Sequence, residues 1–276
     1  MADTDIVITR LSTDDAPAGL VLSAEAHWNQ NEADWRFFLS KGQVFGMRDR
    51  DGVLVATAAL LPYTSGNAWV SMVLVTENWR RRGLATRLVD TCLAEAAKQG
   101  LTPWLDATPA GATVYGPLGF APTIQLRRLR LENSTTVQDR APQPLPAGKL
   151  EDVIARDCQS MGFDRSALLA ELGGRPNSRL LSNRNAMALV RDGRKARHIG
   201  PLFADDPNRA LALVDDIVRS ETGPVLIDAV STHDEFLKGL TGSGWNIERP
   251  FQRMRLGSAA TPAAEKPFAV AGPEYG

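Results

Sequence analysis

Three consecutive arginines stand beside a glycine at the start of an amphipathic stretch, in VTENWRRRGLATRL at residues 75–88. The first amide groups of a helix have no partner inside the helix, and the helix dipole makes that end positive. Gly83 would let a ligand approach the backbone closely. Cations are unfavourable at this end of a helix unless an anion joins them, so the pattern favours an anion-binding site over a merely solvated helix start.

The positive charge of this stretch is local. The whole chain carries a formal net charge of -1. Binding to nucleic acid or to an anionic membrane surface usually draws on a strongly basic surface, which this composition does not supply. We therefore expect neither nucleic acid nor a membrane as the main partner.

The cellular location is also an expectation from the sequence. The first residues contain no apolar signal core, and no apolar run approaches the roughly 18 residues that span a bilayer. Of the two cysteines, Cys92 falls within an apolar helical pattern, where a free thiol packs as a small hydrophobe. These features predict a cytoplasmic protein in a reducing compartment.

Hydrophobic periodicity places this stretch between a strand and a helix. Apolar residues at helical spacing predict the helix at 84–98, and alternating or continuous apolar runs predict strands before and after it. The order expected for the first half is β α α β β β α β α β. The expected elements are a strand at 5–11, helices at 12–27 and 32–40, strands within 43–63 and at 67–75, the helix at 84–98, a strand at 102–108, a short helix at 114–119 and a strand at 120–131.

The second half repeats the endings of the first. WLDAT at 104–108 corresponds to LIDAV at 226–230, and GFAPTIQLRRLRL at 119–131 corresponds to GWNIERPFQRMRL at 244–256. Such self-similarity predicts a divergent duplication of one fold. The predicted parts are an N-terminal copy at 1–134, a polar, proline-rich linker at 135–148, a C-terminal copy at 149–257 and a flexible tail at 258–276.

The spacing of Val75, Arg80, Gly83 and Ala85 resembles the pyrophosphate-binding signature of the GNAT superfamily of N-acetyltransferases. Its context agrees, because the signature follows the fourth strand and precedes Tyr115. The resemblance covers 5–131 and implies an α/β (α+β) fold with a mixed central sheet flanked by helices. The second half resembles a degenerate second copy, so two tandem copies are expected.

The resemblance implies acetyl-CoA as co-substrate, with its pyrophosphate at the arginine-rich turn and its pantetheine on the backbone of the fourth strand. The three histidines are too scattered for a metal site, so no metal is expected. In the C-terminal copy, Asp205 and Asp206 stand where phosphates would lie, so that copy is not expected to bind CoA. The implied cofactor-binding residues are Met72, Val73, Leu74, Val75, Arg80, Arg81, Arg82, Gly83, Leu84, Ala85 and Thr86.

Two residues are candidates for catalysis. By resemblance, Tyr115 would protonate the departing CoA thiolate; alternatively it only packs near the site. Asp106 lies in an apolar strand, where a carboxylate must be paired, solvated or functional. It is either a base for the amine or a cap for the helix that starts near Pro109, and a base acting through water also stays open.

Selection of the acceptor is expected from the first two helices and their connection. Aromatic faces beside acidic groups suit a cationic amine. The alternative is that the tryptophans anchor the core and the acids cap a helix. The candidate acceptor-binding residues are Trp28, Asn29, Gln30, Glu32 and Trp35.

The predicted activity is the transfer of acetyl from acetyl-CoA to a primary amine by direct attack, in the N-terminal copy. The alternative is a non-catalytic acyl-CoA-binding or regulatory module. The acceptor is a small-molecule or peptide amine. Homodimer formation is left open.

Overall fold

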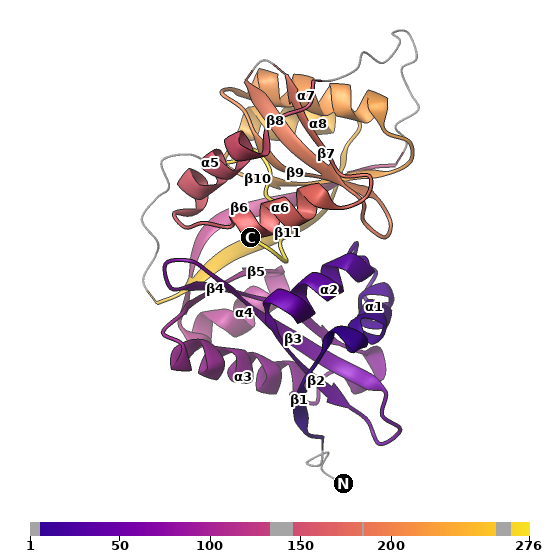
Figure 1. Cartoon of the computed structure of the whole chain (residues 1–276), viewed down its shortest axis with the longest axis vertical. Coiled ribbons are helices and arrows are strands. Elements are labelled where there is room, and N and C mark those ends of the chain that lie inside the picture. The colour runs from indigo at the N-terminus through magenta and orange to yellow at the C-terminus, as the bar shows by residue number, and fades with distance from the viewer. Residues whose placement is uncertain (1–5, 133–145, 184, 258–265) are drawn as a thin grey trace. The chain divides into compact units, whose positions relative to one another are not determined.

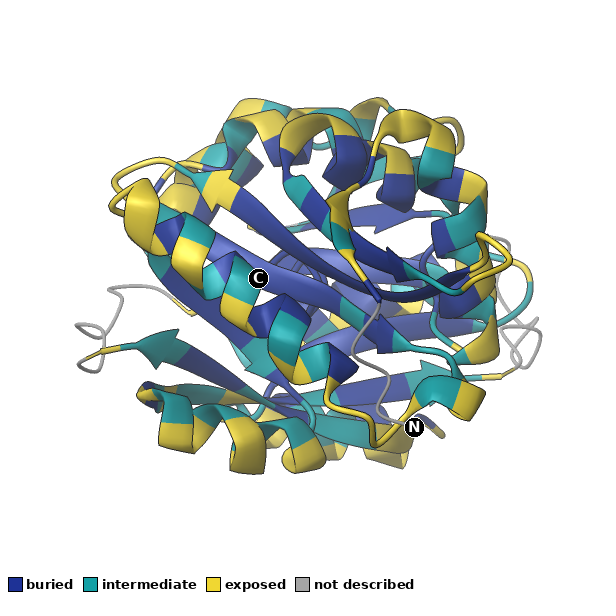
Figure 2. Cartoon of the chain, turned by 90° about the horizontal axis from the view of Figure 1, so that it is seen from below, coloured by how far each residue is buried: buried dark blue, intermediate teal, exposed yellow. Residues whose placement is uncertain are grey.

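The computed structural model of the chain describes residues 6–132, 146–183, 185–257 and 266–276. The chain divides into two compact units: Met1–Leu105 together with Tyr275, and Asp106–Glu274 together with Gly276. Figure 1 labels the elements, and Figure 2 shows that burial concentrates on the strands while the helices keep exposed outer faces.

The first unit is built on a sheet in the order β1-β2-β3-β4-β5. Neighbouring strands are antiparallel except β4 and β5, which run parallel. Eight consecutive residues of β3 are buried, as expected for a strand covered on both faces. The elements are β1 (Ile8–Arg10), α1 (Ala16–Glu25), α2 (Glu32–Lys41), β2 (Gln43–Arg48), β3 (Leu54–Tyr63), β4 (Asn67–Val75), α3 (Leu84–Lys98) and β5 (Thr102–Ala107), whose last two residues belong to the second unit.

The second unit has the sheet order β11-β6-β10-β9-β8-β7. Only β9 and β10 run parallel to each other. Helices α7 and α8 pack on one face, in a cluster that includes Leu213, Ile217 and Phe236. The elements are α4 (Pro109–Tyr115), β6 (Phe120–Leu131), α5 (Leu150–Met161), α6 (Ser166–Gly174), β7 (Arg179–Asn183), β8 (Ala186–Arg191), β9 (Arg197–Phe203), α7 (Pro207–Ser220), β10 (Val225–Val230), α8 (Asp234–Gly242) and β11 (Asn246–Leu256).

Helix starts follow the capping residues in the sequence. Asn31 accepts from the amide of Asp34, whose carboxylate accepts from the amide of Asn31 in return, so α2 has a complete capping box. Thr108 caps α4 by accepting from the amide of Gly111 at 3.3 Å. The element order predicted for the first half matches the observed order through β6.

Strand β6 has both of its antiparallel partners in the second half of the chain. It pairs with β10 on one side and with β11 on the other. The sequence placed β6 in an N-terminal copy ending at residue 134; that boundary stays a prediction. Most of the predicted linker, 135–145, lies outside the described residues, and Ala147 forms a bridge with Leu181.

The prediction of a flexible tail at 258–276 is wrong over its second part. Residues 258–265 lie outside the described range, whereas residues 267–276 are all buried. The amide of Val230 donates to Phe268 and the amide of Leu202 donates to Ala269, each at 2.9 Å. Small side chains allow this segment to run close to the strands, so a composition rich in alanine, proline and glycine did not mean a loose chain.

Candidate cofactor and catalytic site

The arginine-rich turn leads into a helix whose first amides no side chain caps. Gly83 precedes α3 with φ 77° and ψ 5°, a left-handed conformation that suits glycine. A Cβ built on Gly83 would meet no atom within 4 Å, so the space in front of the helix is open to a ligand. The amides of Leu84, Ala85 and Thr86 therefore remain as donors at the positive end of α3.

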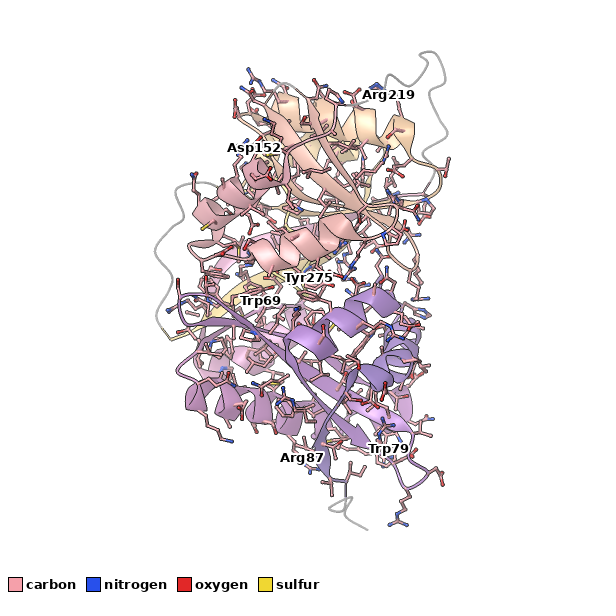
Figure 3. All side chains as sticks on the ribbon, viewed as in Figure 1. Trp69, Trp79, Arg87, Asp152, Arg219 and Tyr275 are labelled. Atoms are coloured by element: carbon pink, nitrogen blue, oxygen red, sulfur yellow. The ribbon has the colours of Figure 1, made fainter. Side chains whose placement is uncertain are left out.

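Two arginine side chains of the turn donate hydrogen bonds to backbone carbonyls, and the turn stays exposed. Arg80 donates from Nε to the carbonyl of Val75 at 3.1 Å, and Arg82 donates from Nη2 to the carbonyl of Asn78 at 2.9 Å. The guanidinium of Arg82 lies 4.7 Å from the ring centroid of Trp79, and Figure 3 labels that tryptophan. Arg80, Arg81, Arg82 and Gly83 are all exposed. The turn before α3 thus presents three exposed arginines next to open space at Gly83.

Glu25 supports this turn and was not singled out from the sequence. Its carboxylate accepts from the hydroxyl of Thr76 and from the amide of Glu77, both at 2.6 Å. The hydrogen bond from Thr76, with help from the amide of Glu77 and the charge of Arg80, lowers the pKa of Glu25. Because Glu25 is 51 residues from Thr76, no local pattern could have indicated the contact.

Strand β4 is irregular where the pantetheine-binding residues were predicted. Met72 has φ 51°, and the register with β3 shifts between Thr57 and Ala59. The hydroxyl of Thr57 donates to the carbonyl of Met72 at 2.9 Å, which fixes the bulge. Pairing of β4 with β5 covers Asn67–Trp69 only. Residues 72–75 therefore lie beyond the part of β4 that pairs with β5, although Leu74 and Val75 are paired with β3.

The two predicted catalytic residues fall in the second unit, and the arginine turn falls in the first. Tyr115 is the last residue of α4, and its half-buried ring makes an edge contact with Phe120 at 5.8 Å. This contact fits the packing interpretation and leaves the role as acid a prediction.

Asp106 is engaged by an arginine from β11. Nε and Nη2 of Arg253 donate to its two oxygens at 2.9 and 2.8 Å, and the carboxylate is wholly buried. Burial raises the pKa of Asp106, and the charge and hydrogen bonds of Arg253 oppose that rise. Asp106 is not the cap of α4, because Thr108 is. As a base it would have to give up a bond to Arg253.

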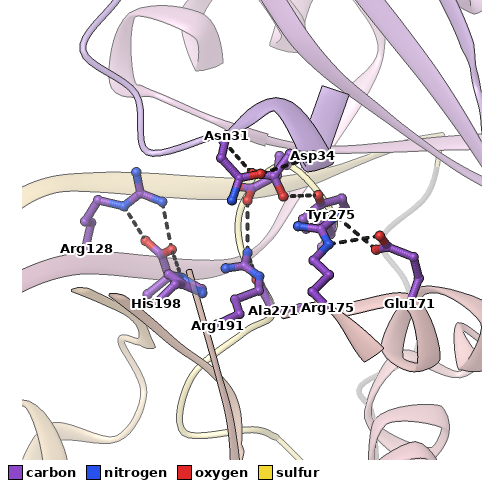
Figure 4. Close-up of polar contacts among 12 residues, drawn as sticks. Asn31, Asp34, Arg128, Glu171, Arg175, Arg191, His198, Ala271 and Tyr275 are labelled. Atoms are coloured by element: carbon purple, nitrogen blue, oxygen red, sulfur yellow. Dashed lines mark hydrogen bonds and ion pairs between the residues drawn. The ribbon is translucent and has the colours of Figure 1, made fainter. Parts of the chain in front are cut away.

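The matching residue of the C-terminal copy makes the same kind of pair. Asp228 on β10 accepts twice at 2.8 Å from Arg128 on β6 (Figure 4). Asp106 and Asp228 occupy equivalent strands, and Arg253 and Arg128 occupy equivalent last strands. Each copy's last strand thus supplies the arginine for the aspartate of the other copy.

His198 completes the buried group around Asp228. Its Nε2 lies 2.9 Å from Oδ2 of Asp228, while its Nδ1 has no hydrogen-bond partner among the described residues. Burial, with the charge of Arg191 acting in the same direction, lowers the pKa of His198 to about 4. Burial opposes ionisation of Asp228, but Arg128 and His198 hold the pKa of that carboxyl below its usual range. His198 is therefore neutral and donates from Nε2.

The predicted acceptor-binding residues lie in two places, on α2 and in the loop that precedes it. Trp35 is fully buried over Gly19, and its Nε1 donates to the hydroxyl of Ser23 at 2.9 Å, so it is a core anchor. Glu32 forms an ion pair with Arg36 one turn later. Trp35 thus fits the alternative of a core anchor, whereas Glu32 is not the cap of α2, because Asn31 and Asp34 form the capping box.

The loop between α1 and α2 differs. Trp28 is half-buried, and Asn29 and Gln30 are buried. Oε1 of Gln30 has no hydrogen-bond partner among the described residues. A buried carbonyl oxygen without a partner is costly unless something donates to it.

Another aromatic residue joins α2 from far along the chain. Tyr275 belongs to the first unit, where its hydroxyl donates to Asp34 at 2.7 Å and its ring stacks on Phe38 at 5.1 Å. Tyr63 donates to its carbonyl at 2.8 Å. No local pattern indicated this contact, and Tyr275 was placed in the predicted tail.

Helix α7 of the C-terminal copy corresponds to α3, and a side chain caps its first turn. Asp206 is the cap of α7 and accepts from the amide of Arg209 at 2.9 Å. Asp205 also pairs with Arg209. A carboxylate thus takes the place at α7 that remains open at α3.

The described residues contain neither a membrane-spanning helix nor a metal-binding cluster. No helix there is long and apolar enough to cross a bilayer. No cluster of three or more histidine, cysteine, aspartate or glutamate side chains there could hold a metal ion.

Comparison with known proteins identifies both halves. A model described as the Acetyltransferase (GNAT) family matches residues 9–120, and a model described as an Acetyltransferase (GNAT) domain matches residues 153–269. The chain is 22% identical over 236 residues to the uncharacterized N-acetyltransferase YitH of Bacillus subtilis, covering 82% of this chain and 83% of that protein.

Solved structures share the fold. A putative acetyltransferase from Pyrococcus horikoshii superposes with a TM-score of 0.82 at 19% identity, covering 100% of this chain and 98% of that one. A tandem GNAT protein from the clavulanic acid biosynthesis pathway gives a TM-score of 0.64 at 15% identity, covering 93% and 100%.

Proposed function

The chain belongs to the GNAT superfamily, with two GNAT domains in tandem, and is an acyl-CoA-dependent N-acyltransferase; on this premise we propose that its N-terminal copy transfers acetyl from acetyl-CoA to a primary amine. The observation that carries the proposal is the contrast between two equivalent helices. The start of α3 is uncapped, exposed and flanked by three arginines, whereas Asp206 caps α7. Of these two helices, α3 is the one whose first amides no side chain caps, so it can offer them to a pyrophosphate.

In the proposed site, the arginine turn and the first amides of α3 bind the pyrophosphate of acetyl-CoA. Arg80, Arg81 and Arg82 supply charge, and Gly83 allows the phosphates to approach the backbone. The backbone of Met72–Val75 binds the pantetheine, because the bulge at Met72 leaves this part of β4 outside the ladder with β5. The thioester supplies the acetyl group.

The chemistry is a direct acyl transfer. The amine nitrogen forms a bond to the acetyl carbonyl carbon, and the carbon–sulfur bond breaks. Tyr115 donates its phenolic proton to the leaving thiolate, whose basicity is comparable. An alkylammonium ion has a pKa near 10.4, so the acceptor must lose a proton before attack. We assign that proton to water rather than to Asp106, whose two oxygens already accept from Arg253.

The acceptor is bound by the loop between α1 and α2. The unpartnered Oε1 of Gln30 supports this assignment, because it would accept from an ammonium or amine N–H group. Trp28 adds a half-buried aromatic face that suits a cation. Trp35 and Glu32 act in the fold of α1 and α2 and are left out of the acceptor site.

Calorimetry with CoA tests the cofactor site. Gly83→Asp places a carboxylate where the pyrophosphate should lie, and we expect CoA binding to be lost. Gly52→Asp is the matched control, because Gly52 also has positive φ and open space within 4 Å but lies in the β2–β3 turn. Any backbone strain is then common to both variants. The site is misassigned if Gly83→Asp binds CoA as tightly as Gly52→Asp.

A further inference from the structure

Strands β9 and β10 pair over part of their length and then leave backbone groups for another chain segment. Their parallel register covers Arg197–Ile199 and Val225–Ile227. Beyond it, Leu202 on β9 and Asp228 and Val230 on β10 direct their hydrogen bonds to the segment at 267–271 instead of to each other. We call this place the β9–β10 opening.

The segment at 267–271 bonds to both strands of the opening. The amide of Phe268 donates to Leu202 at 2.8 Å, and Leu202 donates back to Ala269 at 2.9 Å. On the other side, the amide of Val230 donates to Phe268 at 2.9 Å and the amide of Val270 donates to Asp228 at 3.0 Å. An extended peptide that adds to strand edges in this way is bound by β-augmentation.

The side chains of the segment enter two different clusters. Phe268 stacks on His233 with ring centroids 4.1 Å apart and meets Phe236 edge-on at 5.2 Å. Val270 packs in the cluster of Leu126, Val230 and Phe251. The carbonyl of Pro267 lies 3.1 Å from Nε2 of His233. The opening therefore selects an aromatic residue, a small residue and an aliphatic residue in sequence.

Strand β9 is also shaped to let a peptide backbone pass. A Cβ built on Gly200 would lie 2.1 Å from the carbonyl oxygen of Val270. No side chain fits there while the segment is in place. At the far end of the segment, Nη2 of the buried Arg191 donates to the carbonyl of Ala271 at 2.7 Å (Figure 4).

We propose that the β9–β10 opening is a binding site for an extended peptide, and that its ligand is the chain's own segment at 267–271. Backbone bonds on both sides give affinity, and the Phe268 and Val270 clusters give specificity. The occupied opening cannot accept an acyl chain, so the C-terminal copy is a peptide-binding module. This inference does not depend on the acetyl transfer proposed for the N-terminal copy.

Cleavage of the full chain tests whether the segment is a ligand. A protease recognition sequence is placed within residues 258–265, which the structure does not describe, and the protein is cut while folded. We expect the released segment to co-elute with the main chain at micromolar concentration and to exchange with a labelled synthetic peptide of residues 266–276. Dissociation from the intact main chain in one column run would overturn the proposal.

Two comparisons assign the binding to the opening. A competitor peptide of residues 266–272 lacks Tyr275 and should still displace the label, while the same peptide with Phe268→Asp should be at least about 100-fold weaker. Equal competition by both peptides would refute the proposal. This comparison uses the wild-type main chain and so does not depend on the folding of any variant.

A variant of the main chain gives the complementary result. Gly200→Ala should release the segment after cleavage, because its Cβ would collide with Val270. Gly242→Ala is the matched control, since a Cβ there meets nothing within 4 Å. Retention of the segment by a folded Gly200→Ala protein at the level of Gly242→Ala would contradict the proposed path of the peptide.

Discussion

Replacing Asp106 by asparagine keeps the size of the side chain and removes the charge that Arg253 neutralises. The wild-type pair has two charge-assisted hydrogen bonds of 2.9 and 2.8 Å, and the two side chains are 0% and 6% exposed. Removing one member of such a buried pair leaves the other charge unpaired and costs about 3–5 kcal/mol. For a protein of this size that corresponds to a fall in Tm of roughly 6–20 °C.

The same variant separates a structural role from a catalytic one. If Asp106 serves only to hold Arg253, the kcat of the folded variant should stay within a few-fold of wild type. Loss of a general base would instead lower kcat by about 10²–10⁴. The measurements are the free energy of unfolding in denaturant and the initial rate of thiol release with the best acceptor from a screen, both at a temperature where the variant is folded.

Two further variants complete this test. Asp90→Asn removes an exposed carboxylate on α3 and should change stability by less than about 0.5 kcal/mol. Asp106→Asn combined with Arg253→Met should recover part of the stability lost by Asp106→Asn alone, because no unpaired buried charge remains. A kcat lower by about 10²–10⁴ with an unfolding free energy within about 1 kcal/mol of wild type would refute the structural assignment.

Three other predictions follow from the contacts described. Tyr115→Phe removes the proton donor and should lower kcat about tenfold to a thousandfold with little change in CoA affinity by calorimetry; an unchanged kcat would eliminate the acid role. His198 has a folded pKa of about 4 against about 6.5 unfolded, so its contribution is complete above pH 6.5 and about 3 kcal/mol is lost as pH falls to 4. Between pH 7 and 4, the free energy of unfolding of the wild type should therefore fall more steeply with decreasing pH than that of His198→Gln. Equal pH dependence of the two free energies would contradict the burial of a neutral imidazole. A chain ending at Glu132 lacks β10 and β11, which flank β6, so circular dichroism should show loss of cooperative folding; a cooperative melt would show that β6 does not need them.

Much of the fold follows from local patterns that the sequence displays. The apolar runs of β2–β4, the apolar stripe of α3 and the capping box of α2 depend on residues close together in the chain, so their positions were predictable. Strand β7 is hard to predict from the sequence, because RLLSN is short and its two leucines are adjacent instead of alternating with polar residues.

The parts of the site that were not predictable depend on residues far apart in the chain. Arg253 is 147 residues from Asp106, and Tyr275 is 241 residues from Asp34. Periodicity carries no information on such pairs. Trp35 shows how a local pattern can mislead. An aromatic residue beside acids suggested a cation site, but Trp35 is buried against Gly19 because of how α1 and α2 pack. The open turn at Gly83 was predictable because its residues are consecutive.

The reciprocal pairs Asp106–Arg253 and Asp228–Arg128 bear on how this duplicated chain can evolve. Each half of the gene encodes an arginine whose partner is encoded by the other half. Deletion of either half therefore leaves a charged side chain of the remaining half without its partner. Changes at the start of α7, where Asp206 caps the helix, do not involve these pairs. Selection for a folded chain is then enough to retain both halves, whatever ligand each one binds, and the gene is inherited as an indivisible pair.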